Sequence, residues 1–177
     1  ALVKIGYLRR ILGKSKVYAA AEWIARAVLM GEAVVVFCEH QEPLKRLQYL
    51  LRKQRIGFVT VQGSTTPKAR LEAVDAFQSG KVPVFIGTKA AKEGITLHRG
   101  RHLLFLERFF TSADEEQAED RIRRIGQRYP TTIWFLHGVN TIDDRLSQII
   151  DSKRRLVDRI IGSADVGESD EGAVMDL

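Results

Sequence analysis

Five short apolar runs alternate with amphipathic stretches along this chain, and this alternation constrains the fold more than any other feature. The runs lie at residues 34–38, 58–61, 82–87, 102–107 and 133–137. Between the first two runs, residues 43–54 carry four leucines at helical spacing. Strands that alternate with helices in this way predict an α/β domain, in which helices cover a parallel sheet.

Two further helices have recognisable starts. Thr66 and Pro67 are a cap and a first-turn proline, followed by Leu71, Val74 and Phe77 on one expected face. The last helix opens with the capping box Thr141-Ile-Asp-Asp, and its apolar residues repeat at helical spacing as far as residue 161.

The two ends of the chain differ from its middle. Ser15 can cap a helix over residues 17–28, which leaves residues 1–14 as a basic lead-in. Residues 163–177 contain five acidic residues and no aromatic one, so we expect an acidic disordered tail there. The folded domain is therefore expected at residues 15–162.

Composition limits the class of protein. With 177 residues, of which 45% are hydrophobic, the chain can form one compact domain. The single cysteine, Cys38, excludes an internal disulfide and is expected to pack in the core. The four histidines lack the spacing of metal ligands, and no apolar run could cross a bilayer or serve as a signal peptide. We expect a soluble intracellular protein, without membrane association, that binds no metal on this domain.

Charge is distributed unevenly. All 28 lysines and arginines precede residue 163, together with 17 of the 22 acidic residues, so residues 1–162 carry a net charge of +11. Such a charge favours a polyanionic partner, and nucleic acid is the leading candidate.

The run from Gln117 to Gln127 carries Arg121 and Arg124, three positions apart on what should be one helical face. Two guanidinium groups at this spacing could grip a polyphosphate and neutralise charge on a transferring phosphoryl group. The same pattern also fits an ordinary salt-bridged helix surface, because Glu116 and Glu119 lie beside the arginines.

Polar loops follow the second and third expected strands, and open parallel sheets bind ligands at the carboxyl ends of their strands. Gly63, Ser64 and Thr65, with Arg70 one turn later, offer amides and hydroxyls to an anion, although helix capping explains them equally well. Thr88 and Lys89 follow the third strand, where a helical turn with surface lysines is an equal alternative.

The run 117–127 resembles the sixth motif of the SWI/SNF-type DNA translocases, a branch of superfamily 2 helicases, whose hallmark is Gln-Ala-x-Asp-Arg-x-x-Arg-x-Gly-Gln. Residues 34–38, 62–77 and 88–94 resemble earlier motifs of the family in the same order. The Gln-Ala-Glu-Asp string is familiar in the annealing-helicase branch. Departures from the family pattern stand at Glu93, Ser112 and Arg123.

This resemblance implies the second, C-terminal RecA-like lobe of a DNA-dependent ATPase, with helices on both faces of a parallel sheet. ATP and Mg²⁺ would be held mainly by a first lobe, and Arg121 and Arg124 would act as arginine fingers across the cleft. Positions near the nucleotide would be Gly94, Thr96, Gln117 and Asp120. Positions on the phosphates of double-stranded DNA would be Gly63, Ser64, Thr65, Arg70, Thr88 and Lys89.

The implied partners are double-stranded DNA and the first lobe, and the isolated lobe is expected to be monomeric and inactive. The parent would translocate on DNA as a remodeller or an annealing helicase, in the nucleus of a eukaryote or the cytoplasm of a prokaryote. One alternative is a catalytically silent module that binds DNA or a partner. A remote alternative is a sulfurtransferase or phosphatase that uses Cys38, but the loop 38–43 has two acidic residues and no glycine to bind an oxyanion.

Two short strings look like phosphate chemistry but lack its context. Residues 12–15 read Leu-Gly-Lys-Ser, without the earlier glycine and the preceding strand of a phosphate loop. Residues 114–117 mimic a magnesium-binding acid box but are separated from the apolar strand by a loop. Neither is expected to bind nucleotide.

Overall fold

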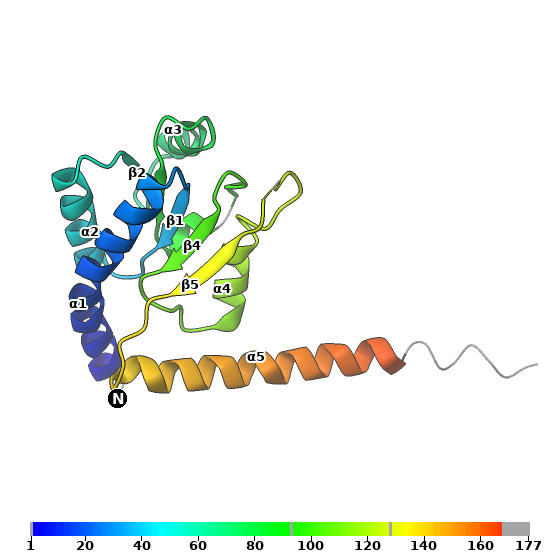
Figure 1. The fold of residues 1–177 in the computed structure, drawn as a ribbon. Helices are drawn as coiled ribbons and strands as arrows, with labels where there is room; N and C mark the ends of the chain where they lie inside the picture. Colours follow the sequence, from blue (N-terminus) through cyan, green and yellow to red (C-terminus); the bar gives the residue numbers. More distant parts are fainter. Residues whose placement is uncertain (1, 93, 128, 168–177) are drawn as a thin grey trace, which may run out of the picture.

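The sheet at the centre of this computed structural model confirms the predicted α/β class. The structure describes residues 2–92, 94–127 and 129–167. Within these residues a five-stranded, all-parallel sheet has the order β2-β3-β1-β4-β5 (Figure 1). Its strands are β1 (Val34–Phe37), β2 (Phe58–Val61), β3 (Val84–Gly87), β4 (His102–Phe105) and β5 (Thr132–Phe135). The expected strands agree with these bounds to within two residues at either end.

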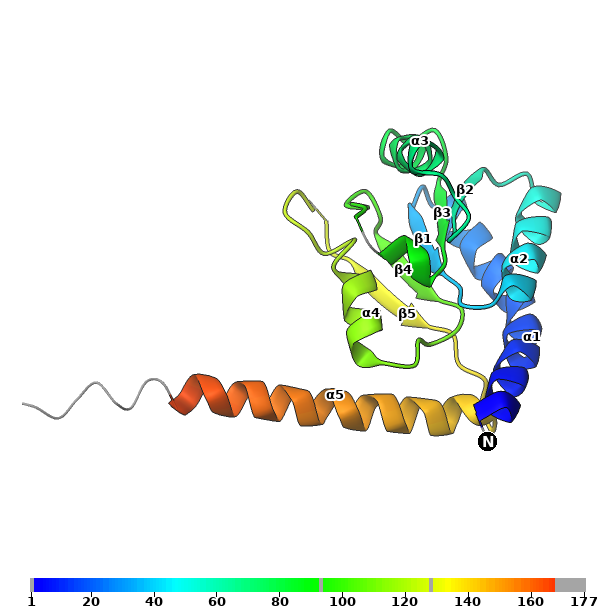
Figure 2. The ribbon, with the colours of Figure 1, turned by 180° about the vertical axis from the view of Figure 1, so that it is seen from behind.

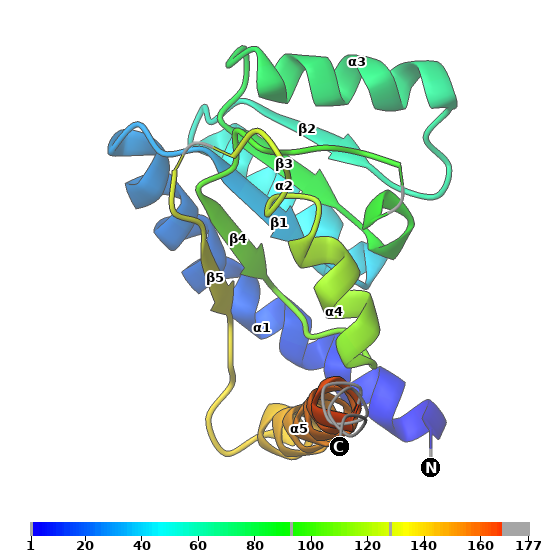
Figure 3. The same ribbon diagram turned by 90° about the vertical axis from the view of Figure 1, so that its right-hand side faces the viewer.

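Helices cover both faces of the sheet (Figures 2 and 3). The helices α1 (Leu2–Leu29) and α2 (Gln41–Lys53) lie on one face, and α3 (Pro67–Gln78) and α4 (Ser112–Glu119) lie on the other. Because alternate strand residues point to opposite faces, Val34 and Val36 pack with the first pair, while Val35 and Phe37 pack with the second. The core therefore has two halves, separated by the sheet.

The helix α3 begins as predicted and buries Phe77 as expected, but one residue of the expected apolar face is exposed. Thr66 Oγ1 accepts a hydrogen bond from the Ala69 amide at 3.3 Å, which confirms the cap. Ala73 and Phe77 are buried, whereas Leu71 is 66% exposed. The expected apolar face was therefore wrong at Leu71.

The helix α1 begins at Leu2, so the expected start at Ser15 is wrong. Ser15 Oγ donates to the carbonyl of Leu12 within the helix instead of capping it. Tertiary contacts hold the first half of α1, because Arg9 is buried and a Cβ at Gly13 would lie 2.7 Å from Glu107 Oε1. The Leu-Gly-Lys-Ser string thus lies inside a helix, where its glycine permits close packing.

The helix α5 (Ile142–Gly167) lies below the body in Figure 1, and its second half projects past it. The capping box is confirmed, since the Thr141 amide donates to Asp144 Oδ2 at 2.8 Å. Residues 163–167 of the expected tail continue this helix, and residues 168–177 lie outside the described residues. No helix in the described part of the chain has the length and hydrophobicity to cross a membrane.

Candidate functional site

Arg121 and Arg124 lie in consecutive turns after α4, so the prediction that they share a helical face is wrong. The helix α4 starts at the Thr111 cap, where Thr111 Oγ1 accepts from the Asp114 amide at 3.2 Å, and it ends at Glu119. Beyond it, Ile122 is fully buried and the Arg121 carbonyl accepts from the Leu97 amide at 2.7 Å. Because these tertiary contacts fix the backbone beyond Glu119, α4 does not continue through the arginine run.

The turns bring both arginines to the segment that follows the 3₁₀ helix η1 (Lys89–Lys92). Arg121 donates from Nε to the Gln117 carbonyl at 3.1 Å and from Nη1 to the Ile95 carbonyl at 3.4 Å. Arg124 Nη1 donates to Thr96 Oγ1 at 2.9 Å. The run that resembles the sixth motif therefore meets the two residues that directly follow the segment 88–94, on the side of the sheet covered by α3 and α4.

The guanidinium groups of Arg121 and Arg124 differ from those of neighbouring arginines in what they contact. Arg123 pairs with Glu119 at 3.3 Å, and Arg108 pairs with Glu115 at 2.7 Å. Arg121 and Arg124, by contrast, bond to carbonyl and hydroxyl oxygens, and no carboxylate of the described residues pairs with them. Both guanidinium groups thus reach residues 95–96 without an ion-pair partner among the described residues, which suits a polyanionic ligand.

The remaining residues expected near the nucleotide are Gly94, Gln117 and Asp120. Gly94 has φ +69°, a left-handed conformation that glycine adopts without strain. Gln117 and Asp120 are exposed at the end of α4. Both side chains are open to solvent, and the Gln117 carbonyl accepts from Arg121 Nε. Glu93, which precedes Gly94 in the chain, lies outside the described residues.

In the loop after β2, one hydroxyl group is hydrogen-bonded within the turn and another is exposed to solvent. Thr65 Oγ1 accepts from the Gln62 amide at 2.9 Å, so this side chain closes the turn. Gly63 and Ser64 are exposed at the tip of the loop, and Arg70 is half-buried in the first turn of α3. Ser64 and the backbone around Gly63 are therefore the groups in this loop best placed to meet a phosphate.

The residues after β3 fit the predicted DNA contact less well. Thr88 is only 6% exposed and its amide donates to the Val61 carbonyl at 3.1 Å, so its burial gives no support to a DNA-binding role. The Lys89 ammonium lies 2.6 Å from Asp114 Oδ2. This ion pair joins η1 to α4 and compensates the charge of Lys89.

A polar network at the carboxyl ends of β1 and β4 was missed in the sequence. Glu107 accepts from the His40 ring at 2.6 Å and from the amides of Glu39 and His40 at 3.1 and 3.0 Å. The hydrogen bond to Glu107 raises the pKa of His40. Burial alone would raise the pKa of Glu107, but the hydrogen bonds from His40 lower it. These residues are 67 positions apart, so only the strand order could have revealed the pairing.

Cys38 lies in the same network as a buried thiol. Burial, followed by the negative charge of Glu107, raises its pKa well above the usual value. A nucleophilic cysteine requires the opposite shift, toward the thiolate. The environment of Cys38 therefore speaks against the sulfurtransferase and phosphatase alternative.

Gln127, which closes the arginine run, has a structural role that its position in the motif did not reveal. Its Nε2 lies 3.0 Å from the Gly100 carbonyl and 3.1 Å from Thr131 Oγ1. These hydrogen bonds attach the end of the segment that carries Arg121 and Arg124 to the residues that precede β4 and β5.

Comparison with known proteins agrees with this architecture. Residues 16–126 match the family described as helicase conserved C-terminal domain. The ATP-dependent helicase fft3 of Schizosaccharomyces pombe is 28% identical over 89% of this chain and 17% of its own length. The DNA repair and recombination protein RAD54B of Homo sapiens is 27% identical over 93% of this chain and 18% of its own. The chain thus spans less than a fifth of either relative.

A solved structure shares the fold. The C-terminal part of the Fun30 ATPase domain superimposes with a TM-score of 0.71 at 27% identity, over 76% of this chain and 44% of that one. A further relative is the SWI/SNF-related matrix-associated actin-dependent regulator of chromatin subfamily A-like protein 1 of Drosophila melanogaster, 26% identical over 82% of this chain and 20% of its own length. The fold is that of a RecA-like helicase C-terminal lobe, and the chain belongs to the helicase conserved C-terminal domain family, with SWI/SNF-type ATP-dependent helicases among its relatives.

Proposed function

We propose that this domain is the second ATPase lobe of a parent protein that hydrolyses ATP and translocates on double-stranded DNA. Arg121 and Arg124 are its arginine fingers. The observation that carries the proposal is that both guanidinium groups reach residues 95–96 without a carboxylate partner among the described residues. The first lobe, which would hold most of the nucleotide and Mg²⁺, belongs to the rest of the parent.

The residues around the arginines fit the phosphates of a nucleotide. ATP would supply the phosphoryl group whose transfer to water releases the free energy for movement. Arg121 and Arg124 would contribute cationic donors, and Thr96 would orient Arg124 through its hydroxyl group, 2.9 Å from Nη1. Gly94, Gln117 and Asp120 would line the same surface.

The DNA-binding part of the proposal rests on exposure and net charge. Gly63 and Ser64 are exposed beyond β2, where amides and a hydroxyl can donate to a phosphate. The same proposal includes Thr65 and Arg70, in and after the loop that follows β2, and Lys89, after β3. Such contacts hold a backbone without reading its sequence, which is what a translocase requires. Chromosomal DNA would place the parent in the nucleus of a eukaryote or the cytoplasm of a prokaryote.

The decisive test is DNA-stimulated ATP hydrolysis by the parent protein with both lobes. Arg121→Gln and Arg124→Gln are expected to lower turnover by about a thousandfold or more, because an arginine finger stabilises charge in the transition state. Arg123→Gln is the matched control, since Arg123 is exposed between them and pairs with Glu119.

The control should change turnover by less than about threefold, as expected of an exposed ion pair. Equal effects of all three substitutions would contradict the finger assignment. If all three variants of the parent hydrolyse ATP at the wild-type rate and still bind DNA, this domain takes no part in catalysis. It would then be a catalytically silent DNA-binding module.

A further inference from the structure

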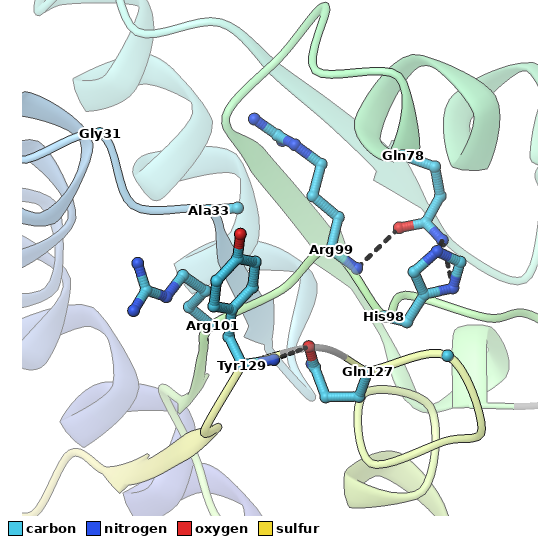
Figure 4. A pocket seen from close by; sticks show the side chains of 9 residues that line it. Gly31, Ala33, Gln78, His98, Arg99, Arg101, Gln127 and Tyr129 are labelled. Carbon is cyan, nitrogen blue, oxygen red and sulfur yellow. Dashed lines mark hydrogen bonds between the residues drawn. The ribbon is translucent and has the colours of Figure 1, made fainter.

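A polar hollow lies at the amino edge of the sheet, away from the loops that follow β2 and β3. Its volume is about 600 Å³, and its walls come from the segments that precede β1, β4 and β5 and from the end of α3. In Figure 4, Arg99, Gln78 and His98 lie on one side, and Arg101 and Tyr129 lie on the other. Nothing in the family motifs predicts a site here.

One wall carries an arginine, Arg99, whose guanidinium contacts neutral acceptors. Arg99 Nη1 donates to the carbonyls of Phe77 and Val82 at 3.0 and 3.1 Å. Its backbone amide donates to Gln78 Oε1 at 3.0 Å, and Gln78 in turn contacts the ring of His98. The acceptors of Arg99 are neutral, and among the described residues no carboxylate pairs with it, so this wall is positively charged.

The opposite wall carries a second, partly compensated arginine. Arg101 Nε lies 3.1 Å from Glu32 Oε2, and the Arg101 guanidinium stands 4.9 Å from the centre of the Tyr129 ring. The side chain of Arg101 is 42% exposed, so its terminal nitrogens can still meet a ligand. The hollow therefore combines two guanidinium groups, a phenol and an imidazole with a single nearby carboxylate of the described residues.

We propose that this hollow binds a small phosphate-bearing molecule, between a pyrophosphate and a mononucleotide in size. Its volume falls within the range of small-molecule sites, and guanidinium groups match the geometry of phosphate oxygens. Glu32 limits the affinity by competing for Arg101.

The ligand would rest against the segment that follows the arginine pair. Gln127 lines the hollow, and its Nε2 also binds the carbonyls of Gly100 and Ile122 at 3.0 and 3.3 Å. A bound anion would therefore slow the opening of the turn that contains Gly126 and Gln127. Binding in this hollow does not depend on the proposed ATPase activity.

Titration calorimetry of the 177-residue chain with inorganic pyrophosphate at low salt tests this proposal. Arg101→Gln should weaken binding at least about fivefold, the loss of one charge-assisted hydrogen bond. Glu32→Gln should strengthen binding, because it frees Arg101. Arg52→Gln is the matched control, since Arg52 is exposed on α2 and stacks on Phe58 at 5.3 Å; this variant should bind as the wild type does.

Hydrogen exchange gives an independent readout, in which pyrophosphate should protect the amides of Gly126, Gln127 and Tyr129. Adenosine, which lacks phosphate, should neither bind nor protect. Absence of binding, or equal weakening in Arg52→Gln and Arg101→Gln, would overturn the proposal. Loss of binding in Arg124→Gln but not in Arg101→Gln would also overturn it, because the anion would then occupy the arginine pair.

Discussion

His40 and Glu107 form a close pair of titratable side chains at the carboxyl edge of the sheet, with 2.6 Å between Nδ1 and Oε1. The imidazole is paired with a carboxylate that is only 3% exposed. The electrostatic attraction between them is greatest when both groups are charged, so the contribution of the pair to stability depends on pH.

The directions of the two pKa shifts define the pH range in which the pair stabilises the fold. The pKa of His40 is raised above 6.5, so its contribution is fully present below that pH and is lost as pH rises through the raised value. The pKa of Glu107 is lowered below 4.5, so its contribution persists down to that pH and is lost on further acidification. The pair should stabilise the fold most between these two values.

His40→Gln should therefore lower the free energy of unfolding more at pH 6 than at pH 8.5, by about 1 to 3 kcal/mol at the lower pH. Urea denaturation at both pH values measures the difference. His98→Gln, which changes an exposed histidine, is the control and should show little pH-dependent loss. A His40→Gln deficit that is equal at both pH values would contradict the charged pair.

Gly13 and Gly6 allow a second comparison at the level of single residues, because both lie in α1. A Cβ at Gly13 would be 2.7 Å from Glu107 Oε1 and 2.8 Å from Pro43 Cγ, whereas a Cβ at Gly6 would meet nothing within 4 Å. Gly6→Ala should stabilise the chain by up to about 1 kcal/mol through helix propensity.

Gly13→Ala should destabilise the chain by about 1 to 3 kcal/mol, because the clash with Glu107 and Pro43 outweighs the same gain in propensity. Thermal unfolding of the two variants side by side measures the contrast. Similar midpoints for both variants would show that α1 can move away from Glu107 without cost.

At the scale of elements, Arg108 connects the end of β4 to two helices. It makes a two-pronged contact with Glu115 of α4, at 3.0 and 2.7 Å, and donates to Asp151 of α5 at 2.8 Å. Glu115 has no solvent exposure, and burial raises its pKa although Arg108 opposes this shift. The docking of α5 thus depends on a cation shared between two acids.

Arg108→Met should destabilise the chain by roughly 3 kcal/mol, because it leaves Glu115 buried without its partner. The double variant Arg108→Met/Glu115→Leu should recover most of this loss, since it removes both charges. Guanidinium denaturation of the single and double variants measures the recovery. A double variant as unstable as the single one would assign the loss to packing of the Arg108 side chain.

Elements were predictable from the sequence where local signals determine them. The strands and the caps at Thr66 and Thr141 follow from apolar runs and hydroxyl side chains. The start of α1 and the end of α4 were not predictable, because buried contacts of Arg9 and Ile122 determine them. The motif residues could be named from the sequence because they are contiguous in it. The role of Gln127 and the pairing of His40 with Glu107 join distant segments, so they required the strand order.

At the scale of the whole molecule, the excess of basic residues predicts how DNA binding should respond to salt. If the domain neutralises two phosphates, its affinity for duplex DNA should fall about tenfold between 50 and 200 mM salt, because counterions are released. Fluorescence anisotropy with two unrelated duplexes of equal length measures this, and both should bind alike. A clear preference for one duplex would argue against backbone recognition.

The projecting half of α5 has a mechanical consequence. Arg154 is held by Glu116 and Glu119 of α4, at 3.4 and 3.2 Å. From there the helix continues to Gly167, about 20 Å at 1.5 Å per residue. A rod fixed at one end converts a small rotation of its base into a larger displacement of its tip. A small rotation of α4 would therefore displace Gly167, and anything attached beyond it, by a larger distance.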